Sequence, residues 1–164
     1  MPFLDAAAAP WVALLALGPL AWAALTDLKR MEIPDEVHFA LIGLFVVWAP
    51  LFLAPDEALV RVVQALVVLA VGLALAVFAG MGGGDMKLAA AAAPFIPPEW
   101  RTLALMLLCL GLVLLFAAMK ALRYGWRKSG RSPHWVSLNP EEKQYPLGVA
   151  ISAAVGILLA AQAA

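Results

Sequence analysis

The chain of 164 residues contains one cysteine, two histidines and few charged side chains, which make up 13% of it. A single cysteine, Cys109, excludes an intramolecular disulfide and a thiolate metal site, and we expect it to pack as a small apolar residue. His38 and His134 have no partner at metal-ligand spacing, so we predict neither a metal nor a cofactor. The 11 basic residues balance the 11 acidic ones. This zero net charge gives no sign of a nucleic acid partner.

Apolar residues, by contrast, make up 65% of the chain, and its mean hydropathy is +0.93. Soluble domains are only about half apolar, so the composition predicts an all-α integral membrane protein. A spanning helix needs about 20 mostly apolar residues. A shorter, alanine-rich segment at 86–98 suits the middle of a helix bundle, because small side chains let helices approach closely. The longer runs lie at about 6–26, 36–54, 58–79, 101–121 and 146–162.

The basic residues predict how these segments cross the membrane. Most lysines and arginines fall in three connectors, at 27–35, 80–87 and 120–145, whereas the other side keeps only Arg61 and Arg101. By the positive-inside rule, the three basic connectors face the cytoplasm and both termini face away from it. This alternation requires the segment at 86–98 to cross the lipid bilayer, which makes about six transmembrane helices.

The connectors leave little room for a soluble domain. Six crossings use about 120 residues, so we expect one membrane domain over residues 1–164. The longest connector, 123–146, mixes basic residues with Trp126 and Trp135. This composition suits a segment that lies on anionic headgroups and sets the topology.

Two acids differ from the rest in position. Asp27 directly follows the first apolar run, and Asp85 lies between a glycine run and the alanine-rich segment. The topology places both on the same side at the same depth. Two such carboxyl groups can share one proton, so that one activates water while the other polarises a carbonyl group, which is peptide hydrolysis without a metal. The helix dipoles predict Asp85 as the ionised base and Asp27 as the protonated acid.

Each acid also has a simpler interpretation. Asp27 could be a solvated helix end beside Lys29 and Arg30, and Asp85 could be a helix N-cap. An N-cap does not require the glycines at 82–84, whose backbone freedom costs stability. We expect Gly82, Gly83 and Gly84 to admit the backbone of an extended substrate peptide. The run lacks the GK[ST] ending of a phosphate-binding loop.

The stretch "GMGGGDMKL" contains the pattern GxGD and resembles the signature of type IV prepilin peptidases, which are membrane aspartic proteases. The stretch "TDLKRMEIPDEV" is similar to the first motif of that family, formed here by Asp27, Pro34 and Asp35. The stretch "YPLGVAISAA" at 145–154 resembles the closing helix of the short Tad/CpaA-type members.

The resemblance implies that Asp27 and Asp85 are the catalytic pair. It also implies that the substrate is a prepilin or pseudopilin, whose short basic leader is removed after a glycine on the cytoplasmic side of the bacterial inner membrane. Longer relatives carry an N-terminal segment with paired CxxC motifs and methylate the new N-terminus. We expect no such segment here, so the resemblance supports a peptidase without N-methyltransferase activity.

Several residues near the pair have two interpretations each. Glu32, Asp35 and Glu36 could attract a basic leader, or they could form a solvated turn with Pro34 as the first residue of the second helix. Lys87 could keep Asp85 ionised, or it could only follow the positive-inside rule. For the whole chain, the alternatives are another GxGD intramembrane protease, such as the signal-peptide-peptidase group, and a non-enzymatic transporter or assembly factor.

Overall fold

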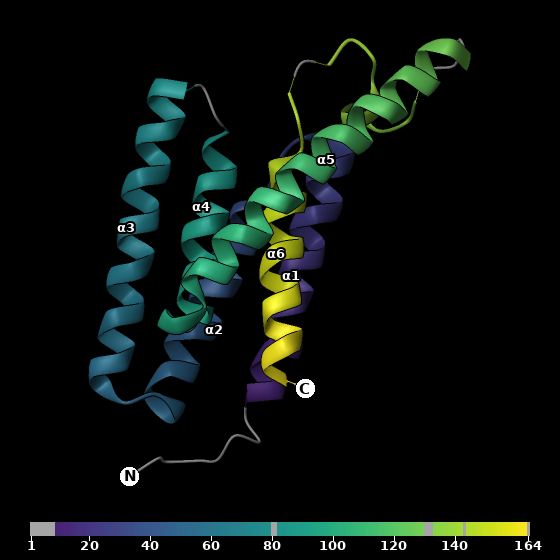
Figure 1. Ribbon diagram of the computed structural model, residues 1–164. Coiled ribbons are helices and arrows are strands. Elements are labelled where there is room, and N and C mark those ends of the chain that lie inside the picture. The colour runs from purple at the N-terminus through teal and green to yellow at the C-terminus, as the bar shows by residue number, and fades with distance from the viewer. Residues whose placement is uncertain (1–8, 80–81, 130–132, 143, 164) are drawn as a thin grey trace.

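The structure is a computed structural model that describes residues 9–79, 82–129, 133–142 and 144–163, and all regular structure in these ranges is helical. The helices form a single bundle (Figure 1). Within the described ranges, three helical segments are long and apolar enough to cross a membrane, namely 35–52, 55–78 and 98–128. The predicted all-α membrane protein is therefore confirmed. The six α-helices are α1 (Ala9–Arg30), α2 (Asp35–Phe52), α3 (Pro55–Ala79), α4 (Gly83–Ala92), α5 (Arg101–Ser129) and α6 (Leu147–Ala163).

The outer helices α3 and α5 present apolar side chains to the surroundings. Phe78 is 89% exposed, Val77 76% and Leu105 63%, which would be unfavourable in water and is favourable against lipid tails. Cys109, which is predicted to pack as a small apolar residue, is also exposed on α5 and therefore lies outside the buried core. The side of the helix that carries it faces away from the bundle.

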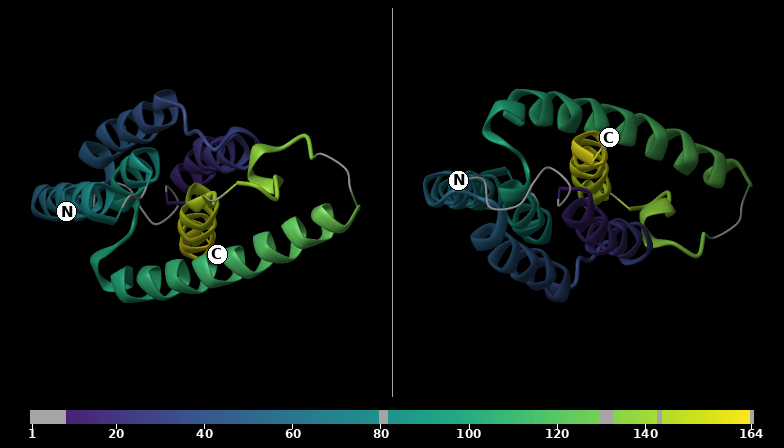
Figure 2. Two further views of the ribbon diagram at one scale, coloured as in Figure 1. Left: turned by 90° about the horizontal axis from the view of Figure 1, so that it is seen from above. Right: turned by 90° about the horizontal axis from the view of Figure 1, so that it is seen from below.

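The core of the bundle lies along α1, whose main packing partner is α6. Ala16, Leu20 and Ala23 recur at helical spacing on α1 and are almost completely buried. Leu41 of α2 and Val155 of α6 belong to the same buried cluster. Viewed along the bundle, α6 lies between α1 and α5 (Figure 2). This arrangement fixes the end of α1 against the start of α6.

Helix α4 is much shorter than a membrane span. Its 10 residues extend only about 15 Å at the ordinary helical rise. Two 3₁₀ turns follow, at Ala93–Phe95 and Pro98–Trp100, because proline lacks the N–H group that a continuing helix needs. The segment from α4 to the start of α5 nevertheless runs beside α3 along much of the length of α3 (Figure 1). Gly72 allows this close packing, since a Cβ atom there would lie 2.8 Å from Cβ of Met86.

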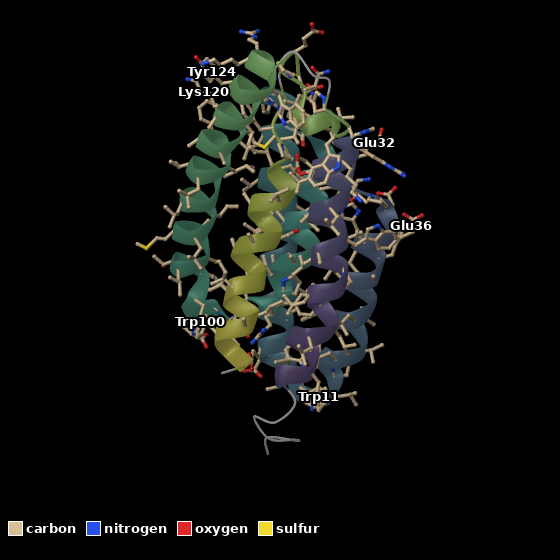
Figure 3. All side chains as sticks on the ribbon, turned by 90° about the vertical axis from the view of Figure 1, so that its right-hand side faces the viewer. Trp11, Glu32, Glu36, Trp100, Lys120 and Tyr124 are labelled. Carbon is tan, nitrogen blue, oxygen red and sulfur yellow. The ribbon has the colours of Figure 1, made fainter. Side chains whose placement is uncertain are left out.

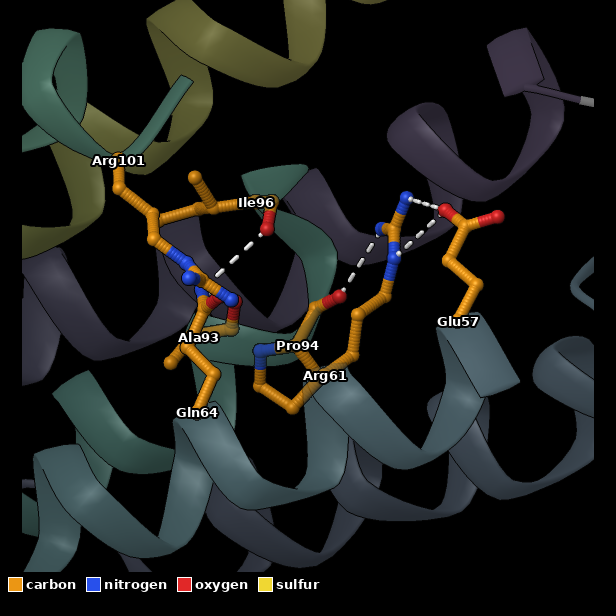
Figure 4. Close-up of polar contacts among 7 residues, drawn as sticks. All are labelled: Glu57, Arg61, Gln64, Ala93, Pro94, Ile96 and Arg101. Carbon is orange, nitrogen blue, oxygen red and sulfur yellow. Dashed lines mark hydrogen bonds and ion pairs between the residues drawn. The ribbon is translucent and has the colours of Figure 1, made fainter. Parts of the chain in front are cut away.

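Side chains of α3 bind the backbone that the broken helix leaves open (Figure 4). Arg61, which is 5% exposed, donates a hydrogen bond from Nη1 to the carbonyl oxygen of Pro94 at 3.1 Å. Gln64 donates from Nε2 to the carbonyl oxygens of Ala93 and Ile96, at 2.7 and 3.2 Å. Inside lipid, such carbonyl groups have no water to bind, so these contacts permit an irregular backbone at this depth.

The two ends of the bundle differ in composition. Helix α1 begins and α6 ends at the end that also carries the turn between α2 and α3, whereas α4 begins at the opposite end (Figure 1). Trp11 and Trp100 lie near the first end, and Glu32, Lys120 and Tyr124 near the second (Figure 3). The alternation of helix directions is the one that the basic connectors predict.

Candidate active site

Asp27 lies in the last turn of α1 and is only 4% exposed. The helix ends three residues later at Arg30, and the next residue, Met31, adopts a left-handed backbone conformation with φ of 58°. The N–H group of Met31 binds the carbonyl oxygen of Asp27 at 2.9 Å, which closes the helix. The interpretation of Asp27 as a solvated helix end is therefore wrong, because its side chain is buried in the protein.

Asp85 is the third residue of α4 and is half-buried. The N-cap position belongs to Gly82, so the simpler interpretation of Asp85 as the N-cap is wrong. A Cβ atom on Gly82 would lie 2.6 Å from Oδ2 of Asp85. The φ angle of Gly82 is −61°, which any residue adopts, so the reason for glycine here is space. That space is occupied by the carboxyl group of Asp85.

The two carboxyl groups line the same cavity, which has a volume of about 660 Å³. The cavity lies where the end of α1, the start of α4 and the start of α6 meet, just past the apolar stretches of these helices. Gly83 and Gly84 also line it. Topology thus brings together two acids that are far apart in the sequence, as the sequence predicts.

The surroundings raise the pKa of both acids. Burial is the main cause in each case, and the charge of Asp27 raises the pKa of Asp85 further. The backbone N–H groups of Gly148 and Val149 act in the opposite direction on Asp27, although no contact of its Oδ2 atom has good hydrogen-bond geometry within the described ranges. These contributions favour Asp27 as the ionised partner, the reverse of the order that the helix dipoles predict. Burial and close amide groups outweigh the dipoles here.

Three of the predicted supporting residues line the cavity, and their contacts differ from those expected. Glu32, Asp35 and Lys87 are all lining residues. Nζ of Lys87 lies 3.1 Å from Oδ1 of Asp35, so its partner is Asp35 and not Asp85. The interpretation that Lys87 keeps Asp85 ionised is therefore wrong.

The two other predicted supporting residues lie outside the cavity lining. Glu36 is exposed and lies at the outer edge of the bundle (Figure 3). Pro34 is the N-cap of α2, with an extended ψ angle of 142°, and not its first helical residue. Its carbonyl oxygen accepts a hydrogen bond from the N–H group of Val37 at 3.1 Å. Pro34 therefore sets the turn between α1 and α2, whereas Glu36 is exposed and does not line the cavity.

His38 does not line the cavity but contacts two residues that do, and the sequence does not predict this position for it. It is 5% exposed, and its Nε2 atom lies 3.3 Å from the carbonyl oxygen of Gly84, the residue before Asp85. Its Nδ1 atom lies 3.4 Å from Oδ1 of Asp35. For Nε2 to donate to a carbonyl oxygen, it must carry the proton. The spacing of three residues between Asp35 and His38 on one helix was the available signal.

The connector after α5 forms a second missed part of the site. Gln144, Tyr145 and Leu147 line the cavity, although the sequence predicts a connector that only lies on the membrane surface. A Cβ atom on Gly148 would lie 2.9 Å from Oδ2 of Asp27, so a larger residue there would have to displace this carboxyl group. The stretch at 145–154 gave a resemblance but no role for these residues.

Within the described ranges, no group of three or more histidine, cysteine, aspartate or glutamate side chains is arranged so that it could hold a metal ion. A second cavity, of about 580 Å³, lies between α3, α5 and α6. Its lining is apolar apart from Gln64 and Arg101 and contains no carboxyl group. The first cavity, which both acids line, is therefore the candidate active site.

Comparison with known proteins gives one finding. A family model described as the type IV leader peptidase family matches residues 14–119. The matched region contains Asp27 and Asp85 and ends within α5, before the connector and α6 that complete the cavity. No curated protein and no solved structure matches the chain.

Proposed function

Because the chain belongs to the type IV leader peptidase family, we propose that it is an aspartic endopeptidase that removes the short basic leader from type IV prepilins or pseudopilins of the Flp/Tad type. The observation that carries the proposal is the shared cavity, in which Asp27 and Asp85 lie close enough for the charge of one to raise the pKa of the other. A pair that retains one proton is what metal-free hydrolysis of a peptide bond requires.

In the proposed reaction, the ionised Asp27 takes a proton from a water molecule while the water oxygen attacks the scissile carbonyl carbon. The protonated Asp85 donates a hydrogen bond to the carbonyl oxygen and stabilises the charge that develops there. The C–N bond then breaks, the proton held by Asp27 passes to the leaving amine nitrogen, and the leader departs with a new carboxyl group. Water is the only other reactant, and the pair returns to its starting protonation state.

The charge and shape of the cavity support a basic leader as substrate. Asp27, Glu32, Asp35 and Asp85 line the cavity together with Lys87, so carboxyl groups outnumber the single basic side chain. A cationic segment is attracted to such a surface. Gly83 is exposed and has open space around it, which supports the approach of a substrate backbone at this position.

The proposed site faces the cytoplasm of a bacterium, at the inner membrane. This assignment rests on the basic connectors, which share the end of the bundle where α4 begins. A leader that never leaves the cytoplasm would meet the acids at this end. Both termini would then lie on the other side of the membrane.

Removal of the leader from a co-expressed prepilin tests the proposal. We expect Asp27→Asn and Asp85→Asn each to abolish the shift in mass that marks leader removal, because each variant loses one partner of the pair. Asp56→Asn is the matched control, since Asp56 is an exposed acid in the first turn of α3, at the opposite end of the bundle. Full processing by both active-site variants would rule out the proposed peptidase and leave a transporter or assembly factor.

A further inference from the structure

We propose that Arg123 is a positioning residue of the active site, which holds the connector before α6, described at 133–142 and 144–146, so that residues 144–149 form the cavity wall beside Asp27. The inference rests on the proposed function, because it assigns part of the same site. Arg123 and the wall lie beyond residues 14–119, which match the family model.

Arg123 gathers three backbone carbonyl groups of this connector. Its side chain is buried, with 8% exposed, although it lies near the polar end of α5. Nε donates to the carbonyl oxygen of Ser137 at 2.9 Å and Nη1 to that of Glu142 at 2.8 Å. Nη2 donates to the carbonyl oxygen of Gln144. One guanidinium group thus fixes the connector at three points, which a lysine ammonium group cannot match in geometry.

The same guanidinium group also holds a side chain of the cavity wall. Its Cζ atom lies 4.7 Å from the centre of the Tyr145 ring, a distance typical of a cation–π contact. The other neighbour of this ring is Phe116 of α5, with ring centres 4.8 Å apart. Gln144 and Tyr145 both line the cavity. Arg123 therefore acts on two wall residues directly.

A second tether joins the connector to α1 next to the catalytic acid. Ser137 is fully buried, and its hydroxyl group donates a hydrogen bond to the carbonyl oxygen of Leu28, the residue after Asp27. This carbonyl group belongs to the last turn of α1, where no further helical N–H group is available. The connector thus bridges α5 and the end of α1, and topology alone does not require such a bridge.

The consequence for catalysis follows from the short distance along the chain. Gly148 lies four residues after Gln144, and its backbone N–H group lowers the pKa of Asp27. If the wall moves away, this N–H group and that of Val149 leave Asp27, while its burial continues to raise its pKa. The acid then ionises only at higher pH. The other titratable groups around the cavity are Asp85 and Lys87 of α4, Glu32 before α2, Asp35 at the start of α2, and Tyr145. The N–H group of Gly148 also lowers the pKa of Asp85, so its departure acts in the same direction on both acids.

The test compares Arg123→Gln with Arg127→Gln in the purified full chain, reconstituted in lipid nanodiscs. Arg127 is exposed one turn further along α5, so its variant loses the same positive charge from the same end. With a synthetic prepilin peptide, we expect kcat/KM of Arg123→Gln to fall by about tenfold or more. We also expect the acid limb of its rate profile to move to higher pH, so that a higher pH restores part of the loss. Arg127→Gln should retain the profile of the unaltered chain.

Hydrogen–deuterium exchange gives a readout that needs no cleavage. Peptides that cover residues 144–149 should exchange faster in Arg123→Gln than in the unaltered chain. In Arg127→Gln, their exchange rate should be the same as in the unaltered chain. If Arg123→Gln does not fold, Arg123→Lys and Ser137→Ala provide milder changes, and both should show the faster exchange. Unchanged exchange together with an unchanged acid limb would overturn the inference. If the unaltered chain cleaves no prepilin, the proposed function fails, and exchange at 144–149 still decides the role of Arg123.

Discussion

Asp27 and Asp85 are unfavourable residues for folding at neutral pH, although the proposed chemistry requires both. Their burial raises the pKa of each carboxyl group above the value near 4 of an unfolded chain. The folded protein therefore binds these protons more tightly than the unfolded chain. Below that value both states are protonated and the acids cost nothing, whereas above it ionisation in the buried site lowers the free energy of unfolding.

Replacing either acid by asparagine should therefore stabilise the protein, and the gain should depend on pH. We expect Asp85→Asn to raise the melting temperature in nanodiscs at pH 8 and to leave it almost unchanged near pH 4. The exposed Asp56 provides the control, because Asp56→Asn should have little effect at either pH. A melting temperature of Asp85→Asn that stays below that of the unaltered chain at pH 8 would contradict this account of the site.

Two neighbouring glycines permit a second test at single residues. A methyl group on Gly82 must displace the carboxyl group of Asp85, whereas one on Gly83 meets no atom within 4 Å. We expect Gly82→Ala to lower kcat by at least about tenfold with little change in melting temperature. Gly83→Ala tests substrate binding separately, because the added methyl group should raise KM if the substrate backbone lies against Gly83. Equal and normal kcat values for both variants would exclude the assigned role of Gly82.

The sequence identifies these two acids and their glycines because motif spacing and topology both converge on them. It does not reveal that Gly82 makes room for Asp85 itself, because side-chain direction depends on the exact start of α4. Nor does it reveal the contact between His38 and Gly84, which arises only when α2 packs against α4. The pairing of Lys87 with Asp35 has the same origin, since it crosses between two helices.

At the scale of elements, α4 shows how a ten-residue helix persists inside a membrane protein. Its alanines and Gly72 of α3 allow close packing, and its open C-terminal end is bound by side chains of α3. Glu57 accepts a hydrogen bond from Nη2 of Arg61 at 2.6 Å, and Arg101 donates to Gln64 at the same distance (Figure 4). These contacts lie toward the end of the bundle opposite Asp27 and Asp85, so they support the fold of α4 without contacting the candidate site.

This separation predicts different effects of two buried arginines. We expect Arg61→Met to lower the free energy of unfolding by about 2 kcal/mol, because charged hydrogen bonds to Pro94 and Glu57 are lost. The acid limb of the rate profile should not move, in contrast to Arg123→Gln. Arg101→Met is the control, since Arg101 is exposed and its effect should be smaller. An acid limb that moves in Arg61→Met would mean that the far end of α4 also controls the acids.

At the scale of the whole molecule, the sequence predicts the helix directions but not the wall of the site. Apolar runs and basic connectors suffice to predict these directions. A membrane-spanning segment must be apolar, and the connectors on the cytoplasmic side are enriched in lysine and arginine. The wall at 144–149 depends on bonds from Arg123 and Ser137 to backbone carbonyl groups, which leave no periodic pattern. A connector rich in basic residues and tryptophan therefore suggests a surface role alone.

Labelling of single cysteines tests the predicted orientation. In a Cys109→Ala background, a cysteine that replaces exposed Ala54, between α2 and α3, should react with a membrane-impermeant maleimide in intact cells. A cysteine that replaces exposed Glu141 should react only after the cytoplasmic membrane is permeabilised. The opposite pattern would place the proposed catalytic acids on the outer side, away from a cytoplasmic leader.

The central claim is that Asp27 and Asp85 act as one unit on a bound water molecule. Its most direct test is the rate of leader removal from a synthetic prepilin peptide by the purified chain, its two single asparagine variants and the double variant. Residues that act as a unit give strongly non-additive losses. We predict that each single variant loses at least about a thousandfold in kcat and that the double variant is no slower than either. A single variant that retains a tenth or more of the original rate, or losses that multiply in the double variant, would contradict the account.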